Sequence, residues 1–266
     1  IADANTVLIP VVDLLDKIGC SETVPAIVRR VLREREARYE AIIEEIRRTA
    51  RTFEALELDV VFVKGVSTQA SYGVPIRRQF GDIDIVVPDA ATFWKCADLL
   101  TQDGYVLSGL VLRQDPERGM WTGTGALLRG FDEDLKTCIQ FDFVIGAMHI
   151  FGGSVAPIDN QFFNSSYEIR GLAPAKRPGA LEHFLHFLFC MAERDVLELR
   201  DLMDCSWLVA ELSTDERKVA VEQAISLGLG IELARLADHT VDFLDERPYE
   251  VDLLKEMSLQ LPKKRW

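Results

Sequence analysis

The chain has 266 residues and is 48% hydrophobic, which predicts a well-filled core in one large domain or two modest ones rather than disorder. Its 43 Asp and Glu residues outnumber its 30 Lys and Arg residues, and the net charge of −13 disfavours non-specific binding to long nucleic acid. No stretch approaches the roughly 20 apolar residues that a membrane-spanning helix requires, so we expect no membrane association.

The cysteines are widely scattered and form no CxxC pair, so they suggest neither a zinc site nor a redox pair. The five are Cys20, Cys96, Cys138, Cys190 and Cys205. We therefore expect reduced thiols in a cytoplasmic protein.

The N-terminal part, residues 1–57, is expected to be helical. From about Thr23 to Glu54, hydrophobic residues recur at three- and four-residue steps, which predicts one long amphipathic helix. Its polar face is dense with Glu and Arg, which is typical of a solvated surface. Ser21 and Thr23 are candidate N-caps, and Pro25 is tolerated in the first turn.

Strands and helices are mixed over residues 58–175, which we assign to one sheet-containing core. A strand at Val60–Val63 is followed by a glycine turn and then by a short helix near Ser67–Tyr72. A second strand is predicted at Ile83–Val87, and Asp89 is expected to cap the helix that follows it.

Three further β segments are predicted before residue 145. They lie near Tyr105–Leu112, Ala126–Phe131 and Thr137–Ile145. The glycine-rich segment Gly119–Gly125 lacks the lysine and the spacing of a P-loop, and we interpret it as a β turn or a mobile lid. This order of elements predicts an α+β fold built on a mixed sheet.

The C-terminal part, residues 176–266, is expected to be a helical subdomain, with glycines and prolines marking the breaks between helices. The predicted helices are Gly179–Glu211, Thr214–Leu227, Ile231–Asp245 and Val251–Gln260.

Two aspartates at the start of the second predicted strand are the most informative residues in the chain. Alternate side chains of a strand share a face, so Asp82 and Asp84 should project together, roughly 6–7 Å apart along the backbone. Two like charges at that distance repel by about 2–3 kcal/mol at an effective dielectric near 20. A cation should offset this repulsion, and a divalent metal ion is the obvious candidate.

Polar groups also occur at the ends of two other predicted strands. Lys64-Gly65 and Ser67 follow the first strand, where a glycine turn opening a helix can present backbone N–H groups to phosphate. Asp142 lies between two phenylalanines on a later strand, and burying its carboxylate unpaired would cost several kcal/mol. Three carboxylates converging on one sheet face could hold two Mg²⁺ ions about 3.5–4 Å apart.

The pattern of a glycine-bearing turn, then Asp-x-Asp, then a single acidic residue between hydrophobic ones resembles the DNA polymerase β nucleotidyltransferase superfamily. More narrowly, the chain is similar to an uncharacterised bacterial nucleotidyltransferase family marked by Lys-Gly and then Arg-x-x-Gly-Asp-x-Asp. The second motif reads here Arg78-Gln79-Phe80-Gly81-Asp82-Ile83-Asp84. The recognisable motifs span about residues 58–145, and His186 with Asp204 forms a weaker extension.

The resemblance implies a nucleotidyltransferase core flanked by helices, with Asp82, Asp84 and Asp142 as ligands of Mg²⁺, two ions in all. It implies transfer of a nucleoside monophosphate from an NTP, such as ATP, to an acceptor, with release of pyrophosphate. The acceptor could be a small molecule, a peptide or a protein, whereas long nucleic acid is not expected.

The resemblance also implies which groups meet the nucleotide. Gly65 would lie against its phosphates, and we assign Gly81 to the same side of the site. Lys64 and Arg78 are the cations expected near the triphosphate, although they could instead form ion pairs with the same aspartates. Val66 stands where the superfamily usually has Gly or Ser, so Ser67 is the candidate replacement as a phosphate donor.

Two alternatives remain open. The residue Val66 motivates a non-catalytic nucleotide-binding or regulatory module with the same fold. Asp-x-Asp also occurs in haloacid-dehalogenase phosphatases and glycosyltransferases, but there the apolar strand typically precedes the acidic pair, whereas here Ile85-Val86-Val87 follows it. His183 and His186 have no third metal ligand at suitable spacing, so we interpret them as helix-packing residues.

Overall fold

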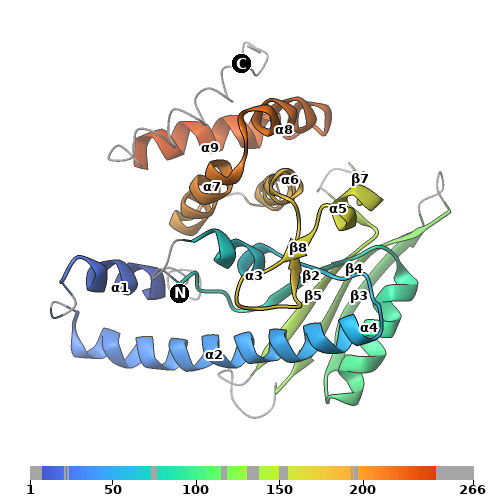
Figure 1. Cartoon of the computed structure of the whole chain (residues 1–266), viewed down its shortest axis with the longest axis horizontal. Coiled ribbons are helices and arrows are strands. Elements are labelled where there is room, and N and C mark those ends of the chain that lie inside the picture. The colour runs from blue at the N-terminus through green and yellow to red at the C-terminus, as the bar shows by residue number, and fades with distance from the viewer. Residues whose placement is uncertain are drawn as a thin grey trace. The chain divides into compact units, whose positions relative to one another are not determined.

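The computed structural model describes residues 8–20, 22, 24–72, 77–114, 119–130, 138–149, 155–192, 194 and 197–243. Internal contacts divide the chain into two compact units, which are described separately below (Figure 1). Unit 1 comprises Ile1–Met148 and Pro157–Pro178, and unit 2 comprises His149–Ala156 and Gly179–Trp266. The N-terminal helices therefore belong to the same unit as the sheet. The finer division at residues 57 and 175 stays a prediction.

The first unit contains a five-stranded sheet and the helices around it. Its helical elements are α1 (Leu8–Lys17), α2 (Ala26–Ala55), α3 (Lys64–Thr68), the 3₁₀-helix η3 (Gln69–Ser71), α4 (Ala90–Gln102) and α5 (Asn160–Asn164). The strands of the sheet are β1 (Val61–Val63), β2 (Ile83–Val87), β3 (Val106–Gln114), β4 (Trp121–Arg129) and β5 (Ile139–Ile145). Two small two-stranded sheets pair β6 (Ala147–His149) with β7 (Val155–Pro157), and β8 (Tyr167–Glu168) with β9 (Lys176–Arg177).

The strand order is β1-β2-β5-β4-β3, so β5 lies in the centre although it comes last in sequence. β2 and β5 are parallel, while the other three neighbouring pairs are antiparallel. The sheet is therefore mixed, and the predicted α+β class is confirmed. Inserting β5 beside β2 brings together two acidic strands that are more than fifty residues apart in the chain.

One face of the sheet is the apolar core of unit 1. Alternate residues of β2 and β5 supply it, because side chains two apart on a strand share a face. These residues are Ile83, Ile85, Val87, Phe141, Phe143 and Ile145. Buried side chains of α2 and α4, among them Ile46 and Phe93, complete the same cluster, and Figure 1 shows both helices on this side of the sheet.

The opposite face carries a second, smaller apolar cluster. Near β1 and β2, a small cluster of Val61, Val63 and Val86 packs against Ile158 and Phe162 at α5. Asp84 and Asp142 occupy the same face, since the alternation that buries their neighbours on the core side directs them away from it.

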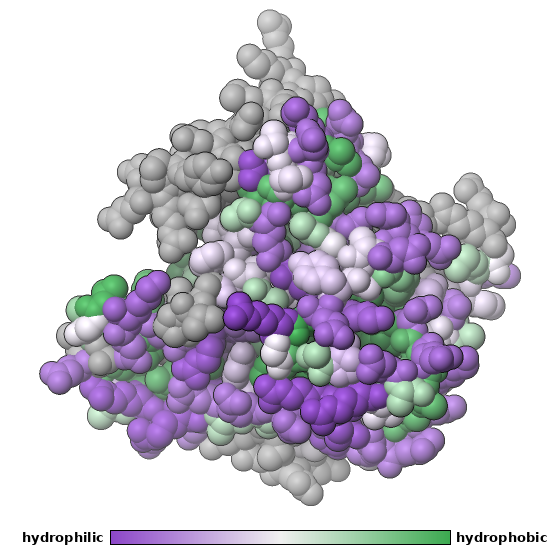
Figure 2. Space-filling model, viewed as in Figure 1, coloured by the Kyte–Doolittle hydropathy of each residue, from purple (hydrophilic) through white to green (hydrophobic). Residues whose placement is uncertain are grey.

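The long helix α2 was predicted from Thr23 but begins at Ala26. Pro25 is its N-cap, with an extended backbone (φ −60°, ψ 149°) and no side-chain capping bond. The candidate caps Ser21 and Thr23 lie outside the described residues. The polar side of α2 forms the strongly hydrophilic band along the lower edge of Figure 2, as its Glu and Arg residues predict.

The predicted turn or lid at Gly119–Gly125 is wrong, because most of this segment is strand β4. A Cβ on Gly125 would lie 2.5 Å from the Phe93 ring, and one on Gly123 would lie 1.8 Å from the carbonyl oxygen of Val111. These glycines therefore permit close packing inside the sheet rather than a turn.

The second unit is helical, with α6 (Ala180–Ala192), α7 (Leu199–Glu211), α8 (Thr214–Ser226) and α9 (Gly230–Phe243). The single helix predicted over Gly179–Glu211 is wrong, since α6 ends at Ala192 and a new helix starts at Leu199. The Asp201 carboxylate accepts a hydrogen bond from the Glu198 backbone N–H and so satisfies a free donor at the start of α7. The helix predicted at residues 251–260 lies outside the described residues.

No helix in the described part of the chain combines the length and apolar character needed to cross a bilayer. The five cysteines all lie in the described part of the chain, and none of them forms a disulfide bond.

Candidate metal centre

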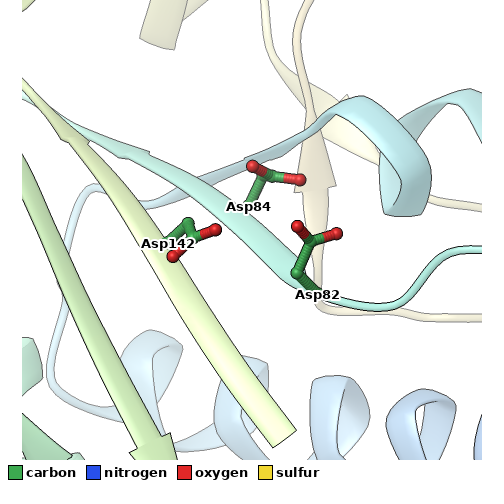
Figure 3. A group of neighbouring side chains, drawn as sticks. All are labelled: Asp82, Asp84 and Asp142. Carbon is green, nitrogen blue, oxygen red and sulfur yellow. The ribbon is translucent and has the colours of Figure 1, made fainter. Parts of the chain in front are cut away.

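The pairing of β2 with β5 brings three carboxylates together. Asp84 and Asp142 are direct partners in the parallel register, and Asp82 lies two residues before Asp84, just ahead of β2. Each offers an oxygen within 4.8 Å of the others, and no other group of three or more His, Cys, Asp or Glu side chains with metal-binding spacing occurs among the described residues. Figure 3 shows the three side chains rising from the same side of the sheet. We call this group the triad.

The electrostatics of the triad favour a bound cation. The side chain of Asp84 is only 5% exposed. Burial is the main reason that its pKa is raised to about 7; the negative charges of Asp82 and Asp142 add to this effect, and the ammonium of Lys64 opposes it. Burial also raises the pKa of Asp142. Burial is the largest cause of both shifts and the negative charge of Asp82 adds to each, so a bound cation would stabilise the ionised forms of Asp84 and Asp142.

Lys64 lies at the junction of β1 and α3, directly beside the triad. Its Nζ is 2.6 Å from Oδ1 of Asp84, and its side chain is 38% exposed. The structure thus shows Lys64 in an ion pair with Asp84, which was the alternative given for this residue. The binding of phosphate by Lys64 stays a prediction. Its backbone has φ +49°, a left-handed conformation that costs a non-glycine residue about 1–2 kcal/mol.

The expected glycine turn after the first strand is not a loop. α3 begins at Lys64 itself, so Gly65 lies inside its first turn. A Cβ on Gly65 would lie 2.4 Å from Cβ of Phe80 and 2.7 Å from Nη1 of Arg78. Glycine is thus required here because the chain leading to Asp82 passes directly against it.

Gly65→Ala should lower the free energy of unfolding by about 1–3 kcal/mol, because the added methyl overpacks this contact. Urea denaturation in EDTA measures the effect. Gly81→Ala is the matched control, since a Cβ there has no neighbour within 4 Å and should change stability little. Equal stability of Gly65→Ala and the wild type would contradict this packing role.

The structure places the other predicted phosphate-binding groups differently from Lys64. Arg78 is buried, with Nη1 donating to the Gln79 carbonyl at 2.9 Å, and Ser67 is fully buried within α3. Gly81 is exposed, and its carbonyl accepts a hydrogen bond from Arg38 of α2 at 2.9 Å. Of the three predicted phosphate-binding side chains, only that of Lys64 reaches solvent.

The sequence analysis missed Gln140. Its Nε2 donates to Oδ1 of Asp142 at 2.7 Å and so fixes the orientation of that carboxylate. The available signal was strand alternation, because residues two apart on β5 share a face. The candidate extension, His186 and Asp204, lies buried on α6 and α7 of unit 2.

The donor set of the triad fits a hard divalent cation. Carboxylate oxygens are the ligands that Mg²⁺ and Ca²⁺ prefer, and the triad offers no sulfur or imidazole that would favour zinc. Lys64 supplies one positive charge beside three carboxylates. A bound cation would therefore lower the electrostatic energy of the site further.

Comparison with a known protein family agrees with this chemistry. The sequence profile of a family described as "Uncharacterised nucleotidyltransferase" matches residues 1–245. Two similar solved structures are an antigenic nucleotidyltransferase-like protein from Paracoccidioides brasiliensis and a candidate nucleotidyltransferase from H. pylori. The first is 14% identical with a TM-score of 0.42, covering 81% of this chain and 93% of its own. The second is 13% identical with a TM-score of 0.41, covering 82% and 90%. No curated protein sequence matches the chain.

Proposed function

Because the chain belongs to the family of uncharacterised nucleotidyltransferases, we propose that it transfers a nucleoside monophosphate from an NTP to an acceptor hydroxyl. The observation that carries the proposal is the convergence of Asp82, Asp84 and Asp142 beside a lysine that is partly open to solvent. The acceptor oxygen would bond to the α-phosphorus as the bond to the bridging oxygen of the β-phosphate breaks. Pyrophosphate would leave, and the hydroxyl proton would pass to a carboxylate of the site.

The three aspartates would hold Mg²⁺, two ions on our interpretation. Bound Mg²⁺ would neutralise phosphate charge and increase the acidity of the acceptor hydroxyl. Asp142 is the carboxylate we assign to the acceptor proton, since as the third carboxylate of the triad it would lie beside the ion that activates the acceptor. Gln140 holds Oδ1 of Asp142 and leaves the second oxygen available for that role.

Lys64 would bind the triphosphate or the departing pyrophosphate. Its ammonium is already at the triad, and its partial exposure allows the flexible side chain to turn from Asp84 toward an anion. The strained backbone at Lys64 supports the proposal, because such conformations concentrate at functional sites. The other residues predicted to meet the nucleotide would shape the backbone beside the site rather than supply further charge to it. They are Gly65, Ser67, Arg78 and Gly81.

The test combines binding and turnover. Calorimetry with Mg²⁺ and each of the four common NTPs should show binding to the wild type, and pyrophosphate release should follow when an acceptor is present. Asp142→Asn should lower transfer by about 10²–10⁴-fold, the usual contribution of a general base, and should keep the thermal unfolding transition. Equal pyrophosphate release by Asp142→Asn and the wild type would contradict the assignment of Asp142.

A second candidate function is a nucleotide-binding module without catalysis. Val66 is completely buried within α3, so the residue after Gly65 offers no hydroxyl to a phosphate. Tight binding of NTP with no pyrophosphate release across a broad set of acceptors would favour this alternative.

A further inference from the structure

The triad already holds a positive charge, the ammonium of Lys64. Its Nζ lies 2.6 Å from Oδ1 of Asp84, which is short enough for a charge-assisted hydrogen bond. The positive charge of Lys64 acts on Asp142 as well as on Asp84. Lys64 is therefore a counter-ion of the metal-free triad.

Strand pairing places Lys64 beside Asp84. Val63, the last residue of β1, is the direct partner of Asp84 in the antiparallel pair of β1 and β2. The chain turns into α3 at the next residue, Lys64, whose backbone has the left-handed φ of +49°. The fold thus fixes the backbone of Lys64 next to the carboxylate that its side chain binds.

A divalent ion and the Lys64 ammonium would compete for Asp84. Mg²⁺ binds oxygen ligands at about 2.0–2.1 Å, whereas Oδ1 of Asp84 is already bonded to Nζ of Lys64. The side chain of Asp84 is only 5% exposed, so it has little room to turn away from the lysine. An ammonium and a divalent ion on one carboxylate would repel each other strongly, because a buried site screens charge less than water does.

The ammonium end of Lys64 can leave Asp84 when another anion is present. The side chain is 38% exposed and its four-carbon stem is flexible, so rotation would carry Nζ toward solvent without moving the backbone. A triphosphate is such an anion. Arg78, the other cation predicted for the phosphates, is buried and donates to the Gln79 carbonyl, so the phosphates depend on Lys64.

We propose that Lys64 weakens binding of the free metal ion to the triad, and that the ligand of the site is the metal complex of a triphosphate. This inference rests on the proposed nucleotidyl transfer and sets the order of binding for it. Lys64 exchanges the Asp84 carboxylate for a phosphate of the arriving complex, and Asp84 then becomes a ligand of the ion. The exchange forms and breaks no covalent bond, and the ammonium keeps a negative partner throughout.

The exchange couples the ion to the triphosphate. By thermodynamic linkage, a triphosphate that draws Lys64 from Asp84 tightens binding of the ion, and the ion tightens binding of the triphosphate by the same factor. Without a triphosphate, the lysine and the ion oppose each other. The triad therefore stays paired with Lys64 until both ligands arrive together.

Calorimetry on the full chain with two titrants tests the exchange. The titrants are Mn²⁺ alone and Mn²⁺ premixed with inorganic tripolyphosphate, a probe that does not depend on the nucleobase. The wild type should bind the complex about ten-fold or more tighter than the free ion, within the usual range of coupling between sites.

Lys64→Met keeps most of the length of the side chain and removes its charge. This variant should bind free Mn²⁺ about ten-fold or more tighter than the wild type, because the coupling that opposes the ion is lost. It should bind the complex no more tightly than the wild type does, since the charge lost at Asp84 is also lost at the phosphates. Lys64→Gln has the same expected results and serves if Lys64→Met does not fold.

Lys95→Met is the matched control. Lys95 is an exposed residue of α4, which packs on the apolar face of the sheet, so the variant removes the same charge at a distance from the triad. Both affinities should equal those of the wild type. Thermal unfolding checks that each variant is folded.

Several results would overturn the exchange. Unchanged binding of free Mn²⁺ by Lys64→Met would mean that the lysine and the ion do not compete. Equal tightening for both titrants would mean that Lys64 stays on Asp84 when the complex binds, and weaker binding of both would assign Lys64 a structural role. An equal effect of Lys95→Met would reduce the result to the overall charge of the protein.

The two proposals fail in different ways. A wild type that releases pyrophosphate with an NTP and an acceptor, but binds Mn²⁺ alone as tightly as the complex, would refute the exchange alone. A wild type that prefers the complex, with that preference lost in Lys64→Met, but releases no pyrophosphate with any NTP across a broad set of acceptors would refute the transfer reaction alone.

Discussion

Asp84→Asn should abolish nucleotide transfer and, in the same variant, stabilise the metal-free protein above pH 7. The substitution removes the most buried charge of the triad and with it a proposed metal ligand. Losing several kcal/mol of metal-dependent stabilisation of the transition state corresponds to about 10³-fold or more in rate. Pyrophosphate release with Mg²⁺ and NTP measures the first effect, and urea unfolding in EDTA measures the second.

The gain in stability follows from the pKa of Asp84, which burial raises from its ordinary value of 3.8 to about 7. Because this pKa is higher in the folded than in the unfolded chain, folding favours the protonated carboxyl. Its favourable contribution is complete below about pH 4 and is lost as the pH rises to 7. At pH 8 the ionised carboxylate costs up to about 4 kcal/mol, at 1.36 kcal/mol for each pKa unit, and an Asn amide avoids that cost.

Asp98→Asn is the matched control for this prediction. Asp98 is an exposed aspartate on α4, so its substitution should leave both activity and the pH dependence of unfolding close to those of the wild type. If Asp84→Asn unfolds more easily than the wild type in EDTA at pH 8, the ionised carboxylate of Asp84 does not destabilise the folded protein. If it keeps full activity, Asp84 is not a metal ligand.

Glu45→Ala should produce the largest loss of stability, about 3 kcal/mol, with no direct effect on the triad. Glu45 is a buried residue of α2 whose carboxylate contacts Arg48 at 2.6 Å and Arg129 of β4 at 3.1 Å. It also accepts a hydrogen bond of 2.8 Å from the buried Tyr105 hydroxyl. Truncation leaves a phenol and two guanidinium groups without this partner. The expected loss is at the low end of the 3–5 kcal/mol range because both arginines are partly exposed.

The pH dependence of this network has the opposite sign to that of Asp84. Burial raises the pKa of Glu45, but hydrogen bonds from Arg48 and Tyr105, together with nearby positive charge, hold it below its ordinary value. The stability that Glu45 contributes is therefore present above the unfolded pKa and lost as the pH falls through the folded one. Glu44→Ala is the matched control, since Glu44 is exposed and pairs with Arg47 at 3.5 Å, and it should change the unfolding free energy by less than about 0.5 kcal/mol. Equal urea midpoints for Glu45→Ala and Glu44→Ala would contradict the role of the network.

Local patterns allowed much of the fold to be predicted from sequence. The alternation of aspartate with apolar residues identified β2 from Ile83 to Val87, and Asp89 caps α4 as expected. The periodicity of α2 predicted a long helix to within a few residues at each end. These features depend on neighbours in the chain, so a single sequence is enough to recognise them.

Features set by tertiary packing were missed or misinterpreted. Gly123 and Gly125 suggested a turn, but contacts with β3 and α4 explain them inside β4. Gly65 suggested a loop, but it lies in the first turn of α3, where Phe80 passes close to it; its place beside the phosphates stays a prediction. Nothing in the sequence around Asp142 or Gln140 shows that β5 pairs with β2, because this pairing joins segments more than fifty residues apart. Strand alternation predicted that Asp82 and Asp84 project together, whereas a position of Asp142 beside them depended on the resemblance.

The most direct measurement of the central claim is titration of the full chain with Mn²⁺, followed by electron paramagnetic resonance of the free ion. Mn²⁺ takes the same oxygen ligands as Mg²⁺ and is observable by this method. We expect the wild type to remove Mn²⁺ from solution saturably, and Asp84→Asn and Asp142→Asn to bind it at least ten-fold more weakly, with Asp98→Asn unchanged. Equal Mn²⁺ binding by all four proteins would show that the three carboxylates do not form a metal centre.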